Sequence, residues 1–189
     1  MIYIKQLLQE YRNEKAKVVK EAAILRFSGV GDQDVYNITA PFEFAGKEVI
    51  AGRIESRDSE VSTVSLFEEV DTNRWTLIAD SIELSLEHPL YTRIAGQVIL
   101  GGVEVVFLED GTANWRTVFY HLATLSEAKK IFEGPWGRKD LRLKQLSSGE
   151  ILVLTRPQGT KGGRVKIGAT IVHALSDLTI EIITEAPLL

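Results

Sequence analysis

The sequence predicts an all-β fold, an incomplete β-propeller with about three four-stranded antiparallel blades after a short N-terminal helix. Beyond residue 20 the chain consists of short runs rich in Val, Ile, Thr and aromatic residues, separated by Gly, Asp, Asn and Ser, which is typical of strands and turns. A unit made of a strand, a tight glycine turn and a longer apolar strand ending in a charge occurs three times, about fifty residues apart. Each unit continues with two further strand-like runs, and four antiparallel strands per repeat are typical of propeller blades.

A short amphipathic helix is predicted at the N-terminus, where Ile4, Leu7, Leu8 and Tyr11 recur at helical spacing. It lacks a strongly basic face, so we expect it to dock on the domain rather than on a membrane surface. The segment also lacks the apolar core and small-residue end of a secretory signal, and no apolar run reaches about 18 residues. The sequence therefore predicts a cytoplasmic protein with no membrane partner.

The repeats divide a single domain, residues 1–189, into a leader and three blades. The leader covers 1–33, and the blades cover 34–80, 86–134 and 138–184. The first hairpins of the blades are DVYNITAPFEFAGKEVIAGRIE, HPLYTRIAGQVILGGVE and KDLRLKQLSSGEILVLTRP. Propellers typically carry about four to eight blades, so three blades leave the ring open and expose an apolar face at its end. We therefore expect a homo-oligomer or a truncated chain.

Composition excludes several classes of function. The net charge of −4 provides no positive field for a polyanion, so nucleic acid is not an expected partner. The chain has no cysteine and three histidines, which excludes a disulfide framework, a thiolate nucleophile and a structural zinc site. We predict no metal site.

Charged residues are expected to gather at one end of the hairpins. Two-residue turns at Ala45-Gly46, Ala95-Gly96 and Ser148-Gly149 would fix the register by counting. In the first hairpin this places Tyr36 opposite Glu55. In the second it places Glu87 opposite Glu104 and His88 opposite Val103. In the third it places Leu141, the neighbour of Asp140, opposite Arg156. All lie where a first strand begins and a second strand ends, so in a propeller they would surround one mouth of the channel.

Glu104 and Asp140 are carboxylates at positions where a predicted strand gives a charged side chain no obvious place. Glu104 lies in the apolar run GGVEVVFL, where desolvation would raise its pKa toward the range of a proton donor, whereas an ion pair with Arg93 would lower it. In RKDLRLK, strand alternation places Asp140 with Arg142 on one face, and the neighbouring cations favour an ionised, ion-paired or solvated aspartate. The sequence leaves the catalytic and the structural interpretation of both residues open.

Three further features have a functional and a structural interpretation. The loop RPQGTKGGRVKIG combines glycines with cations that could cradle an oxyanion such as phosphate, or it is a hairpin loop with incidental charges. His88, next to Pro89, is a general acid or base, or a structural imidazole. Trp136, in EGPWGRKD, stacks on a sugar ring or packs in the fold.

Several of these stretches resemble a largely uncharacterised bacterial family related to the five-bladed β-propeller glycosidases, in particular the mannoside phosphorylases and hydrolases. The resemblance extends from about Leu25 to Ala174 and is carried by DVYNITAPF, GRIESRDSE, HPLYTRI, GGVEV, GPWGRKDLRL and TRPQGTKGGRVKIG. In the mannoside phosphorylases a Glu-Asp-Pro-Arg run supplies the proton donor. The similar run here, Lys139 to Arg142, shares the Asp and the Arg and lacks the Glu and the Pro.

The resemblance implies an incomplete five-bladed-type propeller that cleaves mannooligosaccharides by phosphorolysis or hydrolysis. Asp140 or Glu104 would protonate the glycosidic oxygen, with Asp34 as a second carboxylate. Inorganic phosphate is a possible co-substrate, and no other cofactor is expected. The candidate substrate-binding residues are Arg53, Glu55, His88, Trp136, Arg142, Arg156, Arg164 and Lys166. The alternatives are a non-catalytic carbohydrate-binding or assembly module and a truncated, inactive fragment of such an enzyme.

Overall fold

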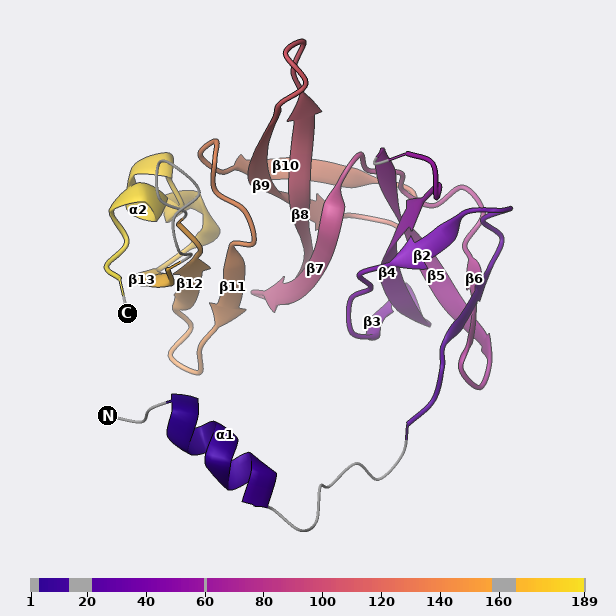
Figure 1. Ribbon diagram of the computed structural model, residues 1–189, viewed down its shortest axis with the longest axis horizontal. Helices are drawn as coiled ribbons and strands as arrows, with labels where there is room; N and C mark the ends of the chain where they lie inside the picture. Colours follow the sequence, from indigo (N-terminus) through magenta and orange to yellow (C-terminus); the bar gives the residue numbers. More distant parts are fainter. Residues whose placement is uncertain (1–3, 14–21, 60, 158–165, 189) are drawn as a thin grey trace.

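The structure is a computed structural model that describes residues 4–13, 22–59, 61–157 and 166–188, and it is built mainly of β-strands in three sheets (Figure 1). The first sheet contains β1 (Arg26–Ser28), β2 (Asp34–Tyr36), β3 (Phe42–Phe44), β4 (Lys47–Glu55), β5 (Ser62–Asp71) and β6 (Arg74–Leu77). The second contains β7 (Glu87–Ile94), β8 (Gln97–Phe107), β9 (Ala113–Leu122) and β10 (Ala128–Glu133). The third contains β11 (Arg142–Gln145), β12 (Ile151–Thr155) and β13 (Gly168–Val172). The predicted predominance of antiparallel β-structure is confirmed.

In the first sheet, two short strands share one long partner. The order is β1-β6-β5-β4-β2, and β3 also pairs with β4, while β1 joins β6 in parallel. Between β2 and β3, Thr39 bonds to Ala51 through both its backbone N–H (2.9 Å) and its hydroxyl (3.0 Å). This interruption shifts the register by two residues. Asp34 lies opposite Glu55 and Tyr36 opposite Arg53, so the predicted Tyr36–Glu55 pair is wrong.

The other two registers differ from the prediction by one residue. A bulge between Glu87 and Leu90 in β7 places Glu87 opposite Val103 instead of Glu104. The β11–β12 turn is longer than predicted, since the N–H of Leu146 donates to the carbonyl of Glu150 at 2.8 Å. Arg142 therefore pairs with Leu154, which leaves Asp140, rather than Leu141, opposite Arg156.

The first two hairpin turns form as predicted. Ala45 and Gly46 have φ angles of 51° and 75°, and Ala95 and Gly96 have φ angles of 49° and 78°. Positive φ at both central residues is the geometry of a type I′ turn, whose twist matches that of paired strands.

The predicted last strand of the third unit is wrong, because residues 180–185 form the helix α2 (Ile180–Glu185) after the short 3₁₀ helix η1 (Leu175–Asp177). Thr179 caps α2 by accepting a hydrogen bond from the N–H of Ile182 at 3.2 Å. Ile183 is fully buried against the third sheet. Capping and this packing outweigh the strand preference of the β-branched run LTIEIIT.

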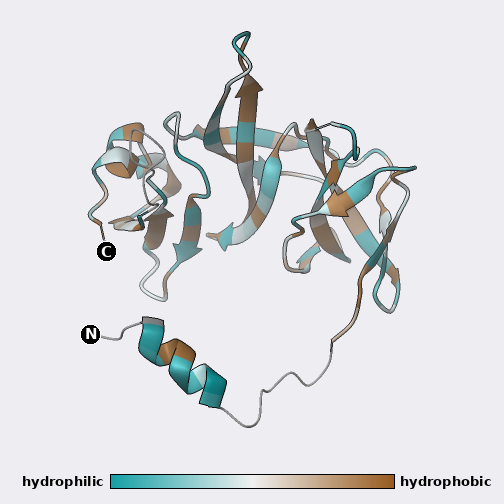
Figure 2. Ribbon diagram, viewed as in Figure 1, coloured by the Kyte–Doolittle hydropathy of each residue, from teal (hydrophilic) through white to brown (hydrophobic). Residues whose placement is uncertain are grey.

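The helix α1 (Ile4–Asn13) forms where the sequence predicts it, but it does not dock on the sheets. Residues 5–13 of the helix are exposed, and Leu7 keeps 50% of its surface in solvent. Figure 2 shows a hydrophobic turn on α1, which Figure 1 places apart from the sheets. The sheets already cover one another's inner faces, so the core does not need α1. No helix in the described ranges is long and apolar enough to cross a membrane.

The second sheet lies at the centre of the core. Val98 and Leu100 of β8 belong to a buried cluster shared with the first sheet, whereas Ile99 belongs to a cluster shared with the third sheet. Alternate residues of one strand thus contact different neighbours, which explains why VILGGV is apolar without interruption.

Substitution of Gly101 tests this close packing. A Cβ atom at Gly101 would lie 2.6 Å from Cδ1 of Phe119 and 3.1 Å from Cδ1 of Leu90, both buried between the second and third sheets. We expect Gly101→Ala to lower the free energy of unfolding by about 1–3 kcal/mol through overpacking, as measured by urea titration. Val106→Thr, at an exposed position on the same strand, is the control and should change it by less than about 0.5 kcal/mol. Equal stability of the two variants would contradict the packing described here.

Candidate active site

The polar residues lie along one edge of the three sheets, where β2, β7 and β11 begin and β4, β8 and β12 end; we call it the polar edge. At the opposite edge, the Arg93 side chain donates to the carbonyl of Glu43, and the N–H of Ala95 donates to Oε1 of Gln145 at 2.9 Å. The hairpin turns of neighbouring sheets therefore lie side by side. Because β7 and β11 also run in the same direction (Figure 1), the polar ends of the hairpins are aligned as well.

Arg53 links the first and second sheets at the polar edge. Its guanidinium forms an ion pair with Glu55, and its Nη2 lies 3.5 Å from Oε1 of Glu87. The Arg53 side chain is only 13% exposed, and its Nε has no hydrogen-bond partner among the described residues. One cation thus serves two largely buried carboxylates. This arginine-centred group, Arg53 with Glu55 and Glu87, has one carboxylate in excess.

His88 and Asn37 extend this group. Nδ2 of Asn37 lies 2.9 Å from Nδ1 of His88, and Nε2 of His88 lies 3.6 Å from Oε2 of Glu87. Asn37, His88 and Asp140 have φ angles of 45°, 48° and 60°, each where a hairpin begins. Positive φ is uncommon outside glycine, and such strain clusters at functional sites. Three of the seven described non-glycine residues with positive φ thus lie along the polar edge.

Asp34 is held in an ion pair with Arg57. Arg57 contacts both of its carboxylate oxygens, at 2.6 and 2.9 Å, and the Tyr36 hydroxyl donates at 3.1 Å. The hydrogen bond from Arg57 lowers the pKa of Asp34, and the hydrogen bond to Asp34 raises the pKa of Tyr36. Asp34 is therefore ionised and occupied by its neighbours.

Asp140 and Arg156 form an ion pair at the start of the third sheet, as expected of residues that face each other across β11 and β12. The Arg142 guanidinium is partly buried and donates to the carbonyl of Leu141 at 3.2 Å. The charges of Asp140 and Arg156 both act on it, yet it forms no ion pair within the described part of the chain. The N–H of Leu141 donates to the hydroxyl of Thr117 at 3.2 Å and anchors this segment to the second sheet. Asp140, Arg142 and Arg156, here called the cationic group, carry one cation in excess.

Glu104 lies in a separate network with Arg116, Lys130 and Glu133. Arg116 Nε is 2.5 Å and Lys130 Nζ is 3.1 Å from its carboxylate. Burial alone would raise the pKa of Glu104, but the hydrogen bonds from these two cations outweigh it and lower the pKa. The expected partner, Arg93, lies at the opposite edge. Glu104 is thus an ionised structural residue, unsuited to donate a proton.

Three predicted substrate-binding residues remain, and the two that the structure describes have different contacts. Trp136 joins the Glu104 network, since the Arg116 guanidinium lies 4.5 Å from its ring centre. Lys166 is exposed and donates its N–H to the carbonyl of Pro157 at 3.1 Å. Arg164 lies outside the described residues. The searched ranges contain no cluster of three or more His, Asp or Glu side chains able to hold a metal ion.

Sequence analysis did not nominate Asn37 or Glu87 as site residues. Asn, Asp and His are the non-glycine residues most often found at positive φ. Asn37, His88 and Asp140 are one of each, at equivalent points of three repeats. That pattern in the sequence could have identified Asn37 as a candidate. Glu87 could not be found in this way, because its contact with Arg53 depends on the packing of two sheets.

The Glu104 network predicts a specific pH dependence. Because its folded pKa lies below the ordinary value of 4.5, Glu104 stabilises the fold above that pH, and this contribution disappears as the pH falls through the folded pKa. We expect Glu104→Gln to lower the free energy of unfolding by about 1 kcal/mol near neutral pH, and by progressively less in acid. Urea titrations across the acid range measure the difference.

The exposed Glu109→Gln serves as the matched control and should leave the stability unchanged at every pH. A Glu104→Gln penalty that is constant with pH would show that the carboxylate charge is not responsible.

Comparisons with known proteins find solved structures that are similar to this chain. The structure matches a mannose phosphorylase from Leishmania mexicana in complex with phosphate ion, at a TM-score of 0.85 and 33% identity, over 98% of this chain and 57% of the other. It matches a GDP-Man-dependent mannosyltransferase from the same organism at a TM-score of 0.82 and 30% identity, over 98% and 57%. A hypothetical protein from Leishmania major gives a TM-score of 0.80 and 32% identity, over 97% and 58%.

The chain thus spans less than two thirds of the length of these structures. The expected relation to mannoside phosphorylases is confirmed, although these relatives come from Leishmania and not from bacteria. No curated protein matches the chain. A family model, in contrast, matches residues 11–189. Because this match covers nearly the whole sequence, the chain belongs to the family described as Protein of unknown function (DUF1861).

Proposed function

We propose that this chain carries the sugar- and phosphate-binding edge of a mannoside phosphorylase, an enzyme that cleaves a mannoside with inorganic phosphate. The observation that carries the proposal is the cationic group, where Arg156 pairs with Asp140 while the nearby Arg142 has no ion-pair partner in the described ranges. The guanidinium group of arginine can donate two parallel hydrogen bonds to a phosphate. A structural relative of this chain is a mannose phosphorylase in complex with phosphate ion.

We further propose that the three sheets are blades of a five-bladed-type propeller within one domain. In this proposal residues 34–80, 86–134 and 138–184 are blades, and residues 1–33 form a leader. Support comes from the repeated hairpin unit, from the alignment of the polar ends, and from the greater length of the solved relatives. The polar edge then corresponds to the mouth of the channel.

The arginine-centred group is the proposed site for the sugar, and the cationic group is the proposed site for phosphate. The excess carboxylate of the arginine-centred group suits the hydroxyl groups of a mannosyl unit, with His88 and Asn37 as further hydrogen-bonding partners. The excess cation of the third sheet suits phosphate. Leu90 and Leu141 belong to one buried cluster, so the two groups begin on segments that pack side by side.

Asp140 is the proposed proton donor. In the structure Arg156 forms an ion pair with it. Phosphate bound to Arg142 and Arg156 would engage this counter-ion and leave the Asp140 carboxyl group available to act as the acid. A phosphate oxygen then forms a bond to the anomeric carbon while the bond to the leaving oxygen breaks and takes the proton from Asp140. The products are a mannosyl phosphate and a sugar with a free hydroxyl.

Phosphate is favoured over water as the nucleophile. Inverting hydrolysis needs a second carboxylate, roughly 6.5–9.5 Å from the acid, to activate water. Asp34 is engaged by Arg57, and Glu104 by Arg116 and Lys130. In this proposal Glu55 and Glu87 share Arg53 and bind the sugar hydroxyls, so they do not activate water. The proposed phosphate instead supplies its own nucleophilic oxygen and needs only a cationic clamp.

Substitutions in the cationic group test the proposal. Purified protein is incubated with α- and β-linked mannobioses, with and without phosphate, and sugar phosphate and free mannose are quantified. We expect phosphate-dependent release of sugar phosphate, and a loss of about 100-fold or more in kcat for Asp140→Asn, because the amide cannot donate the proton. Arg142→Ala should raise KM for phosphate about tenfold, as expected for loss of a charged hydrogen bond.

Lys144→Ala, an exposed cation on the same strand, is the control for general loss of charge and should change neither constant. Release of free mannose without phosphate would replace phosphorolysis by hydrolysis. Sugar binding without any product would instead favour a carbohydrate-binding module.

A further inference from the structure

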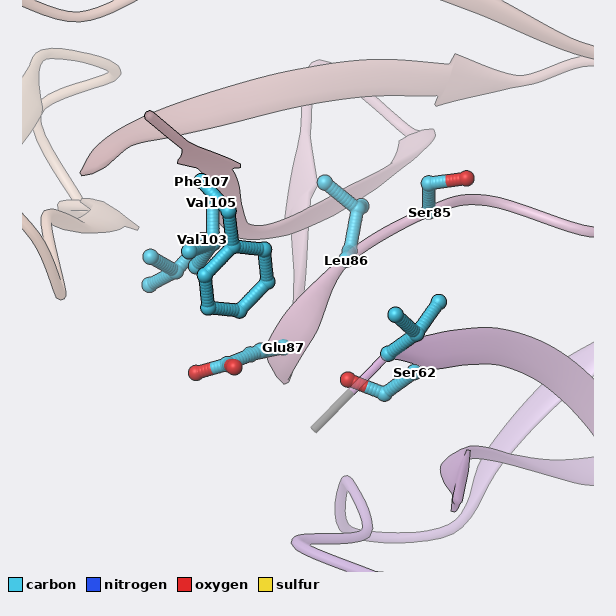
Figure 3. A pocket seen from close by; sticks show the side chains of 8 residues that line it. Ser62, Ser85, Leu86, Glu87, Val103, Val105 and Phe107 are labelled. Carbon is cyan, nitrogen blue, oxygen red and sulfur yellow. The ribbon is translucent and has the colours of Figure 1, made fainter. Parts of the chain in front are cut away.

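A pocket of about 120 Å³ lies between the first and second sheets and includes Glu87 of the polar edge. Figure 3 shows Val103, Val105 and Phe107 of β8 on one side, Ser62 of β5 on the other, and Leu86 and Glu87 close to both. The described residues of the lining include no cation. A neutral ligand with apolar and hydroxyl groups therefore fits this pocket better than an anion does.

Ser62 contributes an unused hydroxyl. The residue is 7% exposed, and its Oγ has no hydrogen-bond partner among the described residues. Buried polar groups in folded proteins almost always have a partner, since leaving one unpaired is unfavourable. Because Ser62 lines the pocket, a ligand hydroxyl placed there would provide that partner.

Phe107 contributes a flat apolar surface. It ends β8 and is 51% exposed, although Val103 on the same strand is buried. An exposed aromatic ring beside buried polar groups has the composition of a small-molecule site, in which apolar contact supplies area and a few polar groups fix the orientation. Pyranose rings offer matching surfaces, with C–H groups on one face and hydroxyls at the rim.

We propose that this pocket is the subsite for the leaving-group sugar, and that it holds a neutral pyranose unit with its C–H face on Phe107 and its hydroxyls on Ser62 and Glu87. The volume corresponds to about four water molecules at ~30 Å³ each, which accommodates a hydroxymethyl arm and part of a ring. The rest of the ring lies over the exposed face of Phe107. The inference rests on the proposed function and adds the second sugar position to it.

Glu87 connects the two sugar positions. Its carboxylate lies near Arg53 and His88 at the polar edge and also lines the pocket. A disaccharide that spans both positions would contact Glu87 with both of its units. The subsite therefore distinguishes a disaccharide from a monosaccharide, which gives the proposal a direct readout.

Calorimetric titration with mannose and with α- and β-linked mannobioses tests the subsite, without any need for turnover. We expect at least one mannobiose to bind about tenfold more tightly than mannose, and Phe107→Ala to abolish this difference while the affinity for mannose is unchanged. Phe107→Trp, which keeps an aromatic surface, should retain the preference. Ser62→Ala should weaken mannobiose binding severalfold, because it removes the hydroxyl partner.

Val106→Thr, exposed on the same strand, is the matched control and should bind like the unsubstituted chain. Equal affinity for mannobiose in Phe107→Ala and in the unsubstituted chain would overturn the subsite while leaving the mannose site standing. A Phe107-dependent preference without phosphorolysis would support the subsite and refute the proposed reaction. No binding of either sugar would overturn both.

Discussion

Burial of the second sheet on both faces is the constraint on which the rest of the structure depends. Val98 and Leu100 face the first sheet while Ile99 faces the third, so a single strand holds the two neighbours together. Gly101 permits the Phe119 ring to lie against the backbone of β8. Because β7 is thereby fixed between the neighbouring sheets, the polar ends of all three hairpins are brought to one edge.

The polar edge combines two opposite departures from charge balance. In the arginine-centred group, Arg53 serves both Glu55 and Glu87, whereas in the cationic group Asp140 is accompanied by two arginines. If every charged side chain had one partner of opposite charge, no charge at this edge would remain available for a ligand. In the proposed function, the excess carboxylate binds sugar hydroxyls and the excess cation binds phosphate.

Strain and unpaired groups occur beside these charges. Asn37, His88 and Asp140 hold left-handed backbone conformations at equivalent points of the repeat, and the buried Ser62 hydroxyl faces a pocket next to Glu87. Stable cores avoid both features because they lower stability. Under the proposed function, the left-handed residues and the unpaired Ser62 hydroxyl would favour the binding of a ligand at this edge.

The sequence by itself determined the β-class, the repeat, two of the three hairpin turns and the N-terminal helix, because each depends on local periodicity or turn chemistry. It also identified Asp140 and Arg156 as neighbours to within one residue. Tertiary structure decided what local patterns cannot encode. The bulge in β7 places Glu87 opposite Val103. Residues 180–185 form a helix because they pack against the third sheet. Glu104 forms ion pairs with Arg116 and Lys130. Registers, helix docking and ion-pair partners depend on contacts between strands distant in sequence, and only the folded chain fixes those contacts.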